Sequence, residues 1–104
     1  MFARIRNGPE DAERYHLEAI ERGRRTLPEG DFVIGLALNA YGETLIALQR
    51  YDEAEQIQLE AYEILESARG VGHNWTQAAV RRMVDLYDAW GKPEQAAEWK
   101  QKLN

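Results

Sequence analysis

Cysteine is absent from this 104-residue sequence, proline occurs only three times, and no apolar run approaches the roughly 18 residues that span a membrane. Without cysteine, neither a disulfide framework nor a cysteine-based zinc site can form, as expected for a reducing compartment. The first six residues are too few and too charged for the apolar region of a signal peptide. We therefore expect a cytoplasmic protein that is not embedded in a membrane.

Positive charge is also scarce. Asp and Glu outnumber Lys and Arg by 18 to 13, which gives a net charge of −5 and a pI of about 5.0. Such a chain has no general attraction to phosphate backbones, so we expect no nucleic-acid partner and mildly favour a basic one. The hydrophobic fraction of 44% is ordinary for a soluble helical protein, and the length predicts a single domain, residues 1–104.

Side chains suited to catalysis are few. The two histidines, His16 and His73, lie far apart in the sequence, and Ser67 is the one serine. Neither histidine has a second strong metal ligand four residues further on (i+4), and the glycines at 70 and 72 lack the strand and third glycine of a phosphate-binding loop. We interpret His16 as a polar residue at a helix–helix contact and His73 as a residue that helps to start a helix. The sequence therefore predicts no catalytic residue, no cofactor, no metal and no enzyme.

One short pattern occurs three times, beginning at Pro9, Tyr51 and Pro93, each copy 42 residues after the last. The copies share small residues at matching positions, which are Ala12, Ala54 and Ala96, with Ala19 and Ala61 seven residues further on in the first two copies. Alanines at this spacing lie on one helical face and let a neighbouring helix approach closely. Each copy therefore begins one helix of a repeated unit.

A second helix of each unit is predicted by apolar residues at i, i+3, i+7 and i+10, which are Leu38, Tyr41, Leu45 and Leu48, and then Val80, Met83, Tyr87 and Trp90. We expect helices over residues 9–26, 32–49, 52–68, 74–90 and 93–103. Asp31 should cap the second helix, and Asn74 with Gln77 has the form of a capping pair. The fold class that follows is an all-α, antiparallel helix-pair α-solenoid.

The order of an apolar helix, a short turn and an alanine-centred helix resembles the tetratricopeptide repeat, whose usual unit is about 34 residues. The 42-residue spacing is similar to the long repeats of kinesin light chains. Residues 86–98 also resemble the closing unit of arrays that follow serine/threonine kinase domains in some bacterial proteins. The resemblance implies a truncated first repeat (1–26), a second repeat (31–68), and a third repeat with a polar C-terminal cap (74–103).

The sequence departs from that family at several packing positions. Where the family prefers an aromatic residue, this chain has His16, Gln58 and Lys100. Where it often has Gly or Ala, the chain has Gly42 and then Val84. These changes affect the expected angles between helices but not the expected architecture.

The resemblance implies a protein-interaction module that binds a peptide or partner protein on its concave face. Polar residues that would gather there are Asn39, Glu43, Arg81, Arg82 and Asp85. The two arginines suit a carboxylate, and the asparagine suits a peptide backbone. In the alternative interpretation, the arginines only form surface ion pairs with Glu43 or Asp85.

Two other groups of residues have a simple structural interpretation. Tyr41, Tyr87 and Trp90 fall on the apolar stripe, so we expect core packing rather than ligand stacking. The helix expected over 52–68 turns a series of carboxylates outward, at Glu53, Glu60, Glu63 and Glu66. These carboxylates would attract a basic partner, but a charged outer face is usually only solvated, and we favour that interpretation.

The helix over 9–26 lacks the partner helix that should precede it, so its apolar residues Tyr15, Leu17 and Ile20 are expected to be uncovered. This predicts a homodimer through the N-terminal edge, with Phe2 and Ile5 contributing. In the rival interpretation, residues 1–6 fold back over the face and leave a monomer. Self-association, or a role as the non-catalytic regulatory tail of a larger signalling enzyme such as a kinase, remains the alternative to partner binding.

Overall fold

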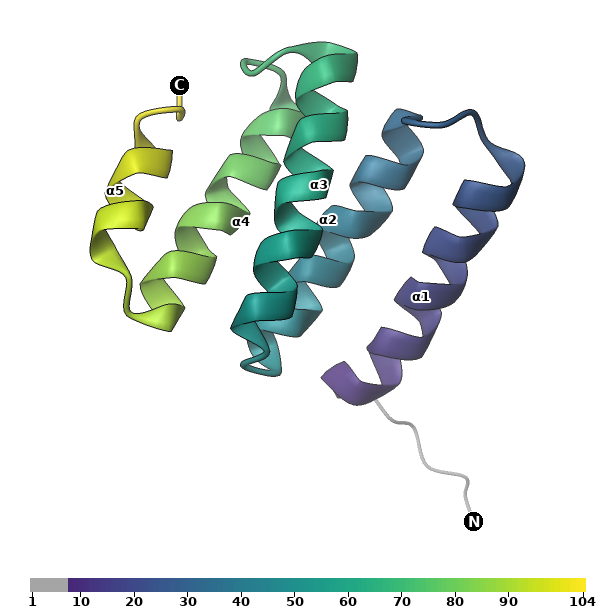
Figure 1. Ribbon diagram of the computed structural model, residues 1–104, viewed down its shortest axis with the longest axis horizontal. Coiled ribbons are helices and arrows are strands. Elements are labelled where there is room, and N and C mark those ends of the chain that lie inside the picture. The colour runs from purple at the N-terminus through teal and green to yellow at the C-terminus, as the bar shows by residue number, and fades with distance from the viewer. Residues whose placement is uncertain (1–7) are drawn as a thin grey trace.

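The computed structural model of the protein describes residues 8–104, and this part of the chain folds into helices joined by short turns (Figure 1). The helices are α1 (Pro9–Thr26), α2 (Phe32–Ala47), α3 (Tyr51–Arg69), α4 (Asn74–Trp90) and α5 (Pro93–Lys100). No strand occurs among these residues, so the predicted all-α class is confirmed. Phe2 and Ile5 lie outside the described residues.

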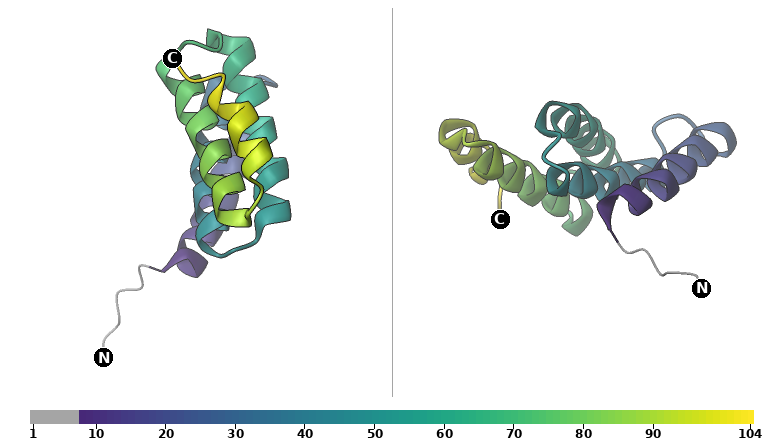
Figure 2. Two further views of the ribbon diagram at one scale, coloured as in Figure 1. Left: turned by 90° about the vertical axis from the view of Figure 1, so that its left-hand side faces the viewer. Right: turned by 90° about the horizontal axis from the view of Figure 1, so that it is seen from below.

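The helices form a staggered array in which α2 is the central element. It packs against α1, α3 and α4, while α4 packs against α3 and α5. Seen from below, α3 stands on one side of the array and α2 on the other (Figure 2). The backbones of α1 and α3 do not meet, and side chains bridge the space between them. This arrangement is the expected antiparallel helix-pair solenoid.

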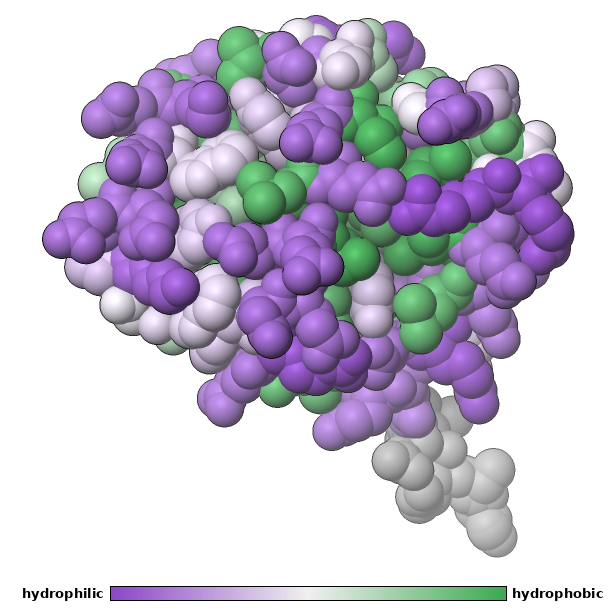
Figure 3. Space-filling model, viewed as in Figure 1, coloured by the Kyte–Doolittle hydropathy of each residue, from purple (hydrophilic) through white to green (hydrophobic). Residues whose placement is uncertain are grey.

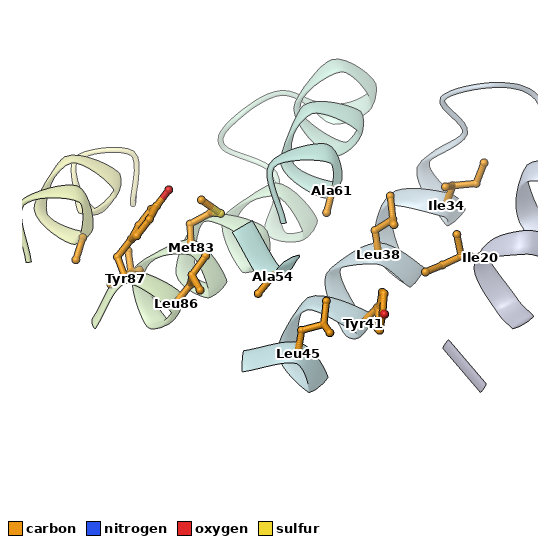
Figure 4. Packing of buried hydrophobic residues seen from close by; sticks show 12 residues of the cluster. Ile20, Ile34, Leu38, Tyr41, Leu45, Ala54, Ala61, Met83, Leu86 and Tyr87 are labelled. Atoms are coloured by element: carbon orange, nitrogen blue, oxygen red, sulfur yellow. The ribbon is translucent and has the colours of Figure 1, made fainter. Parts of the chain in front are cut away.

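The core lies along α2 and α4. Leu38, Leu45, Leu65, Met83 and Leu86 have no exposed area, and burying each large apolar side chain contributes about 1.5–3 kcal/mol. Figure 4 shows the α2 residues of this cluster beside small residues of α3. The core therefore follows the apolar stripes of the second helix of each unit.

The repeated alanines are buried to different extents, depending on which helices pack against them. Ala54 and Ala61 of α3 have no exposed area, because α3 packs between α2 and α4. Ala19, which stands 42 residues before Ala61, is exposed. Since α1 packs against α2 alone, the same position in the repeat is buried in α3 and open in α1.

The helix ends agree with the predicted boundaries at α1 and α4 and differ by up to three residues elsewhere. Asp31 caps α2 as predicted, and its Oδ1 accepts a hydrogen bond from the Val33 amide at 2.9 Å. The expected capping pair at Asn74 is wrong, because His73 is the cap and its Nδ1 accepts from the Trp75 amide at 3.1 Å. Asn74 already lies in the helix. His73 thus helps to start the helix, as expected.

Gln77 holds the C-terminal residues instead of capping α4. Its Nε2 donates to the carbonyl oxygens of Val71 and Lys102 at 2.8 and 2.9 Å, and its Oε1 accepts from the Asn104 amide at 2.9 Å. The last helix consequently ends at Lys100, earlier than predicted, and residues 101–104 turn back toward α4. At the end of α2, Gln49 takes a left-handed conformation (φ 63°), so that helix also ends before the predicted residue.

Gln58 occupies the space beside Gly42 at the contact between α2 and α3. A Cβ atom on Gly42 would lie 1.8 Å from Oε1 of Gln58, so only glycine fits opposite this side chain. Gln58 has no exposed area, and its Nε2 donates to Oδ1 of Asn39 at 2.8 Å. A buried polar pair therefore stands where the family prefers an aromatic residue.

Candidate functional site

Three of the five predicted groove residues, Arg81, Arg82 and Asp85, line a shallow hollow on α4. The hollow has a volume of about 300 Å³ and is lined by Ala78, Arg81, Arg82, Val84, Asp85 and Leu103. Arg81 and Arg82 reach it because they are consecutive on the outward side of α4, between the buried residues Val80 and Met83. Glu43 lies on α2, and its carboxylate comes within ion-pair distance of Arg82.

Arg82 is already paired. Its Nη2 lies 3.5 Å from Oε1 of Glu43, and its Nη1 lies 3.8 Å from Oδ2 of Asp85. The first of these contacts joins α2 to α4. For this arginine, the alternative interpretation of internal ion pairing is the correct one.

Asn39 is not placed to hold a peptide backbone. Its exposed fraction is only 9%, and its Oδ1 accepts the hydrogen bond from Gln58 in the interior. The sequence prediction for Asn39 is therefore wrong, because the residue lies on the side of α2 that packs against α3. Its buried partner was absent from the prediction, since 19 residues separate the two.

Arg81 is the group of this face that stays available. Its side chain is exposed, and it forms no ion pair or hydrogen bond with any of residues 8–104. An arginine has five N–H donors in a planar fork, which suits a carboxylate. The capacity of this face to bind an anion therefore depends mainly on Arg81.

The N-terminal edge is partly as expected. Tyr15 and Leu17 are 61% and 48% exposed, and both lie on α1. Ile20 is only 7% exposed and belongs to the core, where it lies beside Ile34 (Figure 4). The expectation that Ile20 is uncovered is wrong, because it faces α2 rather than the side of α1 that lacks a neighbour.

A polar network that the sequence did not reveal joins α1, α2 and the start of α3. Oε2 of Glu13 accepts from the Tyr41 hydroxyl at 2.7 Å, and the Arg50 guanidinium binds both Glu13 and Glu53. The hydrogen bond from Arg50, followed by that from Tyr41, holds the pKa of Glu13 below its usual value. Burial, together with the bond to Glu13, raises the pKa of Tyr41 to about 12.

The aromatic residues serve the packing, as predicted. Tyr41 and Tyr87 are 5% and 4% exposed, and the Tyr87 hydroxyl donates to Oε2 of Glu55 at 2.6 Å. Burial and this hydrogen bond raise the pKa of Tyr87. Trp90 stacks against Tyr87 and has Lys92 over its ring at 3.8 Å. These contacts leave no free aromatic surface for a stacked ligand at these three residues.

The histidines have structural partners. Nε2 of His16 lies 2.9 Å from Oγ1 of Thr44, which joins α1 to α2, while His73 caps α4. No group of three or more potential metal-ligating side chains occurs in the described part of the chain. Among the same residues, no helix is both long and apolar enough to cross a membrane.

A second hollow, which the sequence did not predict, lies between α1 and α3. It has a volume of about 530 Å³ and is lined by Arg24, Glu29, Gly30, Ile34, Glu60, Glu63 and Ile64. Its walls come from residues up to 40 positions apart in the sequence, so no local pattern marks it. The only advance sign was the outward series of carboxylates on α3.

Comparison with known proteins shows the family of this chain. Neither the curated proteins nor the solved structures gave a match. A family model described as tetratricopeptide repeat matches residues 33–103, which is more than half of the chain. Repeats of this kind generally mediate protein–protein interactions and are typically non-catalytic. With its helix order and packing, the protein belongs to the tetratricopeptide repeat family.

Proposed function

We propose that this protein is an interaction module that holds an acidic segment of a partner protein against α4. The observation that carries this proposal is the guanidinium of Arg81, exposed and unpaired among residues 8–104, at the rim of the 300 Å³ hollow. Ala78 and Val84 supply small apolar surface in the same hollow, and Arg82 adds positive charge beside it. A carboxylate bound by Arg81, with an apolar neighbour resting on Ala78, fits this chemistry.

Titration with a short acidic peptide tests the proposal. The probe is acetyl-Gly-Glu-Leu-Glu-Gly-amide, followed by amide chemical shifts in the labelled protein. Arg81→Ala should weaken binding by about 3- to 10-fold, since an exposed charge-assisted pair contributes about 1 kcal/mol. Arg22→Ala, an exposed arginine on α1, serves as the matched control. Equal affinities of these two variants for the peptide would refute the site.

Arg81 is a cleaner target than both arginines together. Arg82 joins α4 to α2 through Glu43, so its removal also alters a contact within the fold. The single substitution leaves that contact in place. If Arg81→Ala loses peptide binding while the amide shift of Glu43 is unchanged, the loss is due to the missing contact between Arg81 and the peptide.

We also propose self-association through α1 as a second candidate function. Its supporting observation is the uncovered face of α1, on which Ala19 is exposed while its counterpart Ala61 is fully buried. Tyr15, four residues before Ala19, adds apolar area to the same side of α1, whereas the exposed Leu17 lies on the opposite side. A second copy that packs here would give α1 the neighbour that α3 has in α4.

Sedimentation equilibrium at tens of micromolar tests the dimer. Tyr15→Glu with Ala19→Glu should convert it to a monomer, because both side chains are exposed on this side of α1 and the core is untouched. Ile20 is left unchanged, because a charge at a 7% exposed core position would unfold the protein. A monomer in the unmodified protein, or a dimer insensitive to both changes, would exclude this function.

A further inference from the structure

The hollow between α1 and α3 has an apolar floor. Ile34, which is 3% exposed, and the half-buried Ile64 line it together with Gly30. Figure 3 shows apolar surface in the space between α3 and α1, bordered by hydrophilic residues. A volume of about 530 Å³ lies within the usual range for ligand pockets. The space therefore admits one or two side chains of a bound segment.

The rim of this hollow carries an excess of negative charge. Glu60 binds Arg24 through two hydrogen bonds, of 3.0 and 3.2 Å, so this carboxylate and this guanidinium neutralise each other. Glu29 and Glu63 are exposed and form no ion pair or hydrogen bond with the residues that the structure describes. Two uncompensated carboxylates beside an apolar floor attract a cation attached to an apolar segment.

The next repeat shows what the corresponding crevice contains. Positions 42 residues after Gly30 and Glu60 are Gly72 and Lys102. Two contacts hold the C-terminal residues of the chain there. Nδ2 of Asn104 donates to the Gly72 carbonyl oxygen at 3.1 Å, and Nζ of Lys102 lies 5.4 Å from the centre of the Trp99 ring. The C-terminal residues of this chain, Lys102 among them, thus lie against Gly72 in the next repeat.

In the first crevice, the charge at the matching position is reversed. Glu60 stands where the next repeat has Lys102, and Arg24 already pairs with it, so a cation that compensates Glu29 and Glu63 must come from another source. We propose that this hollow binds a basic segment of a partner protein. An aliphatic side chain rests on Ile34 and Ile64, and the flanking lysine or arginine side chains pair with Glu29 and Glu63.

This site is separate from the one on α4. It shares no lining residue with that hollow, and it selects the opposite charge. The module would accordingly hold an acidic segment at Arg81 and a basic segment between α1 and α3. Failure of either proposal leaves the other standing, because each has its own probe and its own variants.

Amide chemical shifts during titration with three blocked pentapeptides test the proposal. The peptides are acetyl-Gly-Lys-Leu-Lys-Gly-amide and two relatives, in which glutamate replaces lysine or serine replaces leucine. The first should shift the amides of Gly30, Ile34 and Ile64. The glutamate peptide should leave these amides unchanged, and the serine peptide should bind about tenfold more weakly, because it lacks the apolar side chain.

A pair of charge-matched variants separates the site from general attraction to an acidic protein. Glu29→Gln with Glu63→Gln should weaken the lysine peptide at least fivefold. Glu18→Gln with Glu98→Gln removes the same net charge from exposed positions elsewhere and should leave its affinity unchanged. Unchanged amide shifts outside the hollow establish that both variants are folded.

Two results would overturn the proposal. One is equal weakening of lysine-peptide binding in the two double variants, which would show that net charge alone attracts the peptide. The other is a set of shifts spread over the surface, or no shifts at Gly30, Ile34 and Ile64 at millimolar peptide. The second result would also follow if another part of this chain already fills the hollow, and it would exclude a partner there.

Discussion

Gly42→Ala adds one methyl group to α2. Whether this substitution lowers or raises the stability of the protein should depend on the residue opposite, Gln58. In an exposed helix interior, replacing glycine with alanine stabilises a protein by about 1 kcal/mol. At Gly42, the added Cβ would lie 1.8 Å from Oε1 and 2.5 Å from Cδ of Gln58. Since Gln58 has no exposed area, its side chain has no free space into which to withdraw.

The expected cost follows from what Gln58 must give up. Moving its amide breaks the 2.8 Å hydrogen bond to Asn39 and leaves buried polar groups without partners, at about 1–3 kcal/mol. Crowding of the α2–α3 contact adds about 1–3 kcal/mol. After the gain in helix propensity of about 1 kcal/mol, we expect Gly42→Ala to lower the free energy of unfolding by about 1–5 kcal/mol.

The methyl group added by Gly42→Ala should stabilise a variant that lacks Gln58. Gln58→Ala alone should cost about 2–4 kcal/mol, because it leaves a cavity and the unpaired oxygen of Asn39. In that background, Gly42→Ala fills part of the cavity and keeps its propensity gain of up to about 1 kcal/mol. The double variant should therefore be more stable than Gln58→Ala.

Urea unfolding followed by circular dichroism at 222 nm measures these four proteins. Gly23→Ala in α1 is the matched control: its added Cβ would meet Cγ1 of Ile34 at a tight 3.3 Å, which a shift of a few tenths of an ångström relieves, and it should change stability by less than about 1 kcal/mol. If Gly42→Ala changes the free energy of unfolding equally in the presence and absence of Gln58, the contact between Gly42 and Gln58 does not determine how α2 packs against α3.

The remaining predictions concern other contacts. Ala61→Leu should destabilise the protein by about 1–3 kcal/mol in urea unfolding, whereas Ala19→Leu, at the matching exposed position, should stay within about 0.5 kcal/mol; equal effects would contradict the packing argument. The pKa of Glu13 is lowered in the folded state by Arg50, so its contribution to stability is present above the unfolded value of about 4.5 and is lost as pH falls through the folded value. Glu13→Gln should flatten this acid limb of the stability profile below about pH 4.5, and an unchanged acid limb would exclude the effect. Gln77→Ala should release the last residues of the chain, raising amide hydrogen exchange at 101–104 without a matching rise in α2.

The sequence by itself determined the repeat, its register and most helix bounds. The recurrence every 42 residues and the apolar spacing within each copy depend on residues close together in the chain, and such patterns survive without knowledge of the tertiary structure. The predicted helix Pro9–Thr26 and the cap at Asp31 are examples. The family could be anticipated for the same reason, whereas the kinesin-light-chain type, the kinase context and the cytoplasmic location stay predictions.

Only the tertiary structure decided which side chains are available. Asn39 and Ile20 were assigned to surfaces from helical position alone, yet each faces a neighbouring helix that covers it. Burial depends on how far one helix is rotated against the next, and a rotation of a fraction of a turn moves a residue from solvent to core. The hollow closed by Arg24 and Glu60 depends on residues 36 positions apart, a distance at which no sequence spacing records that two side chains meet.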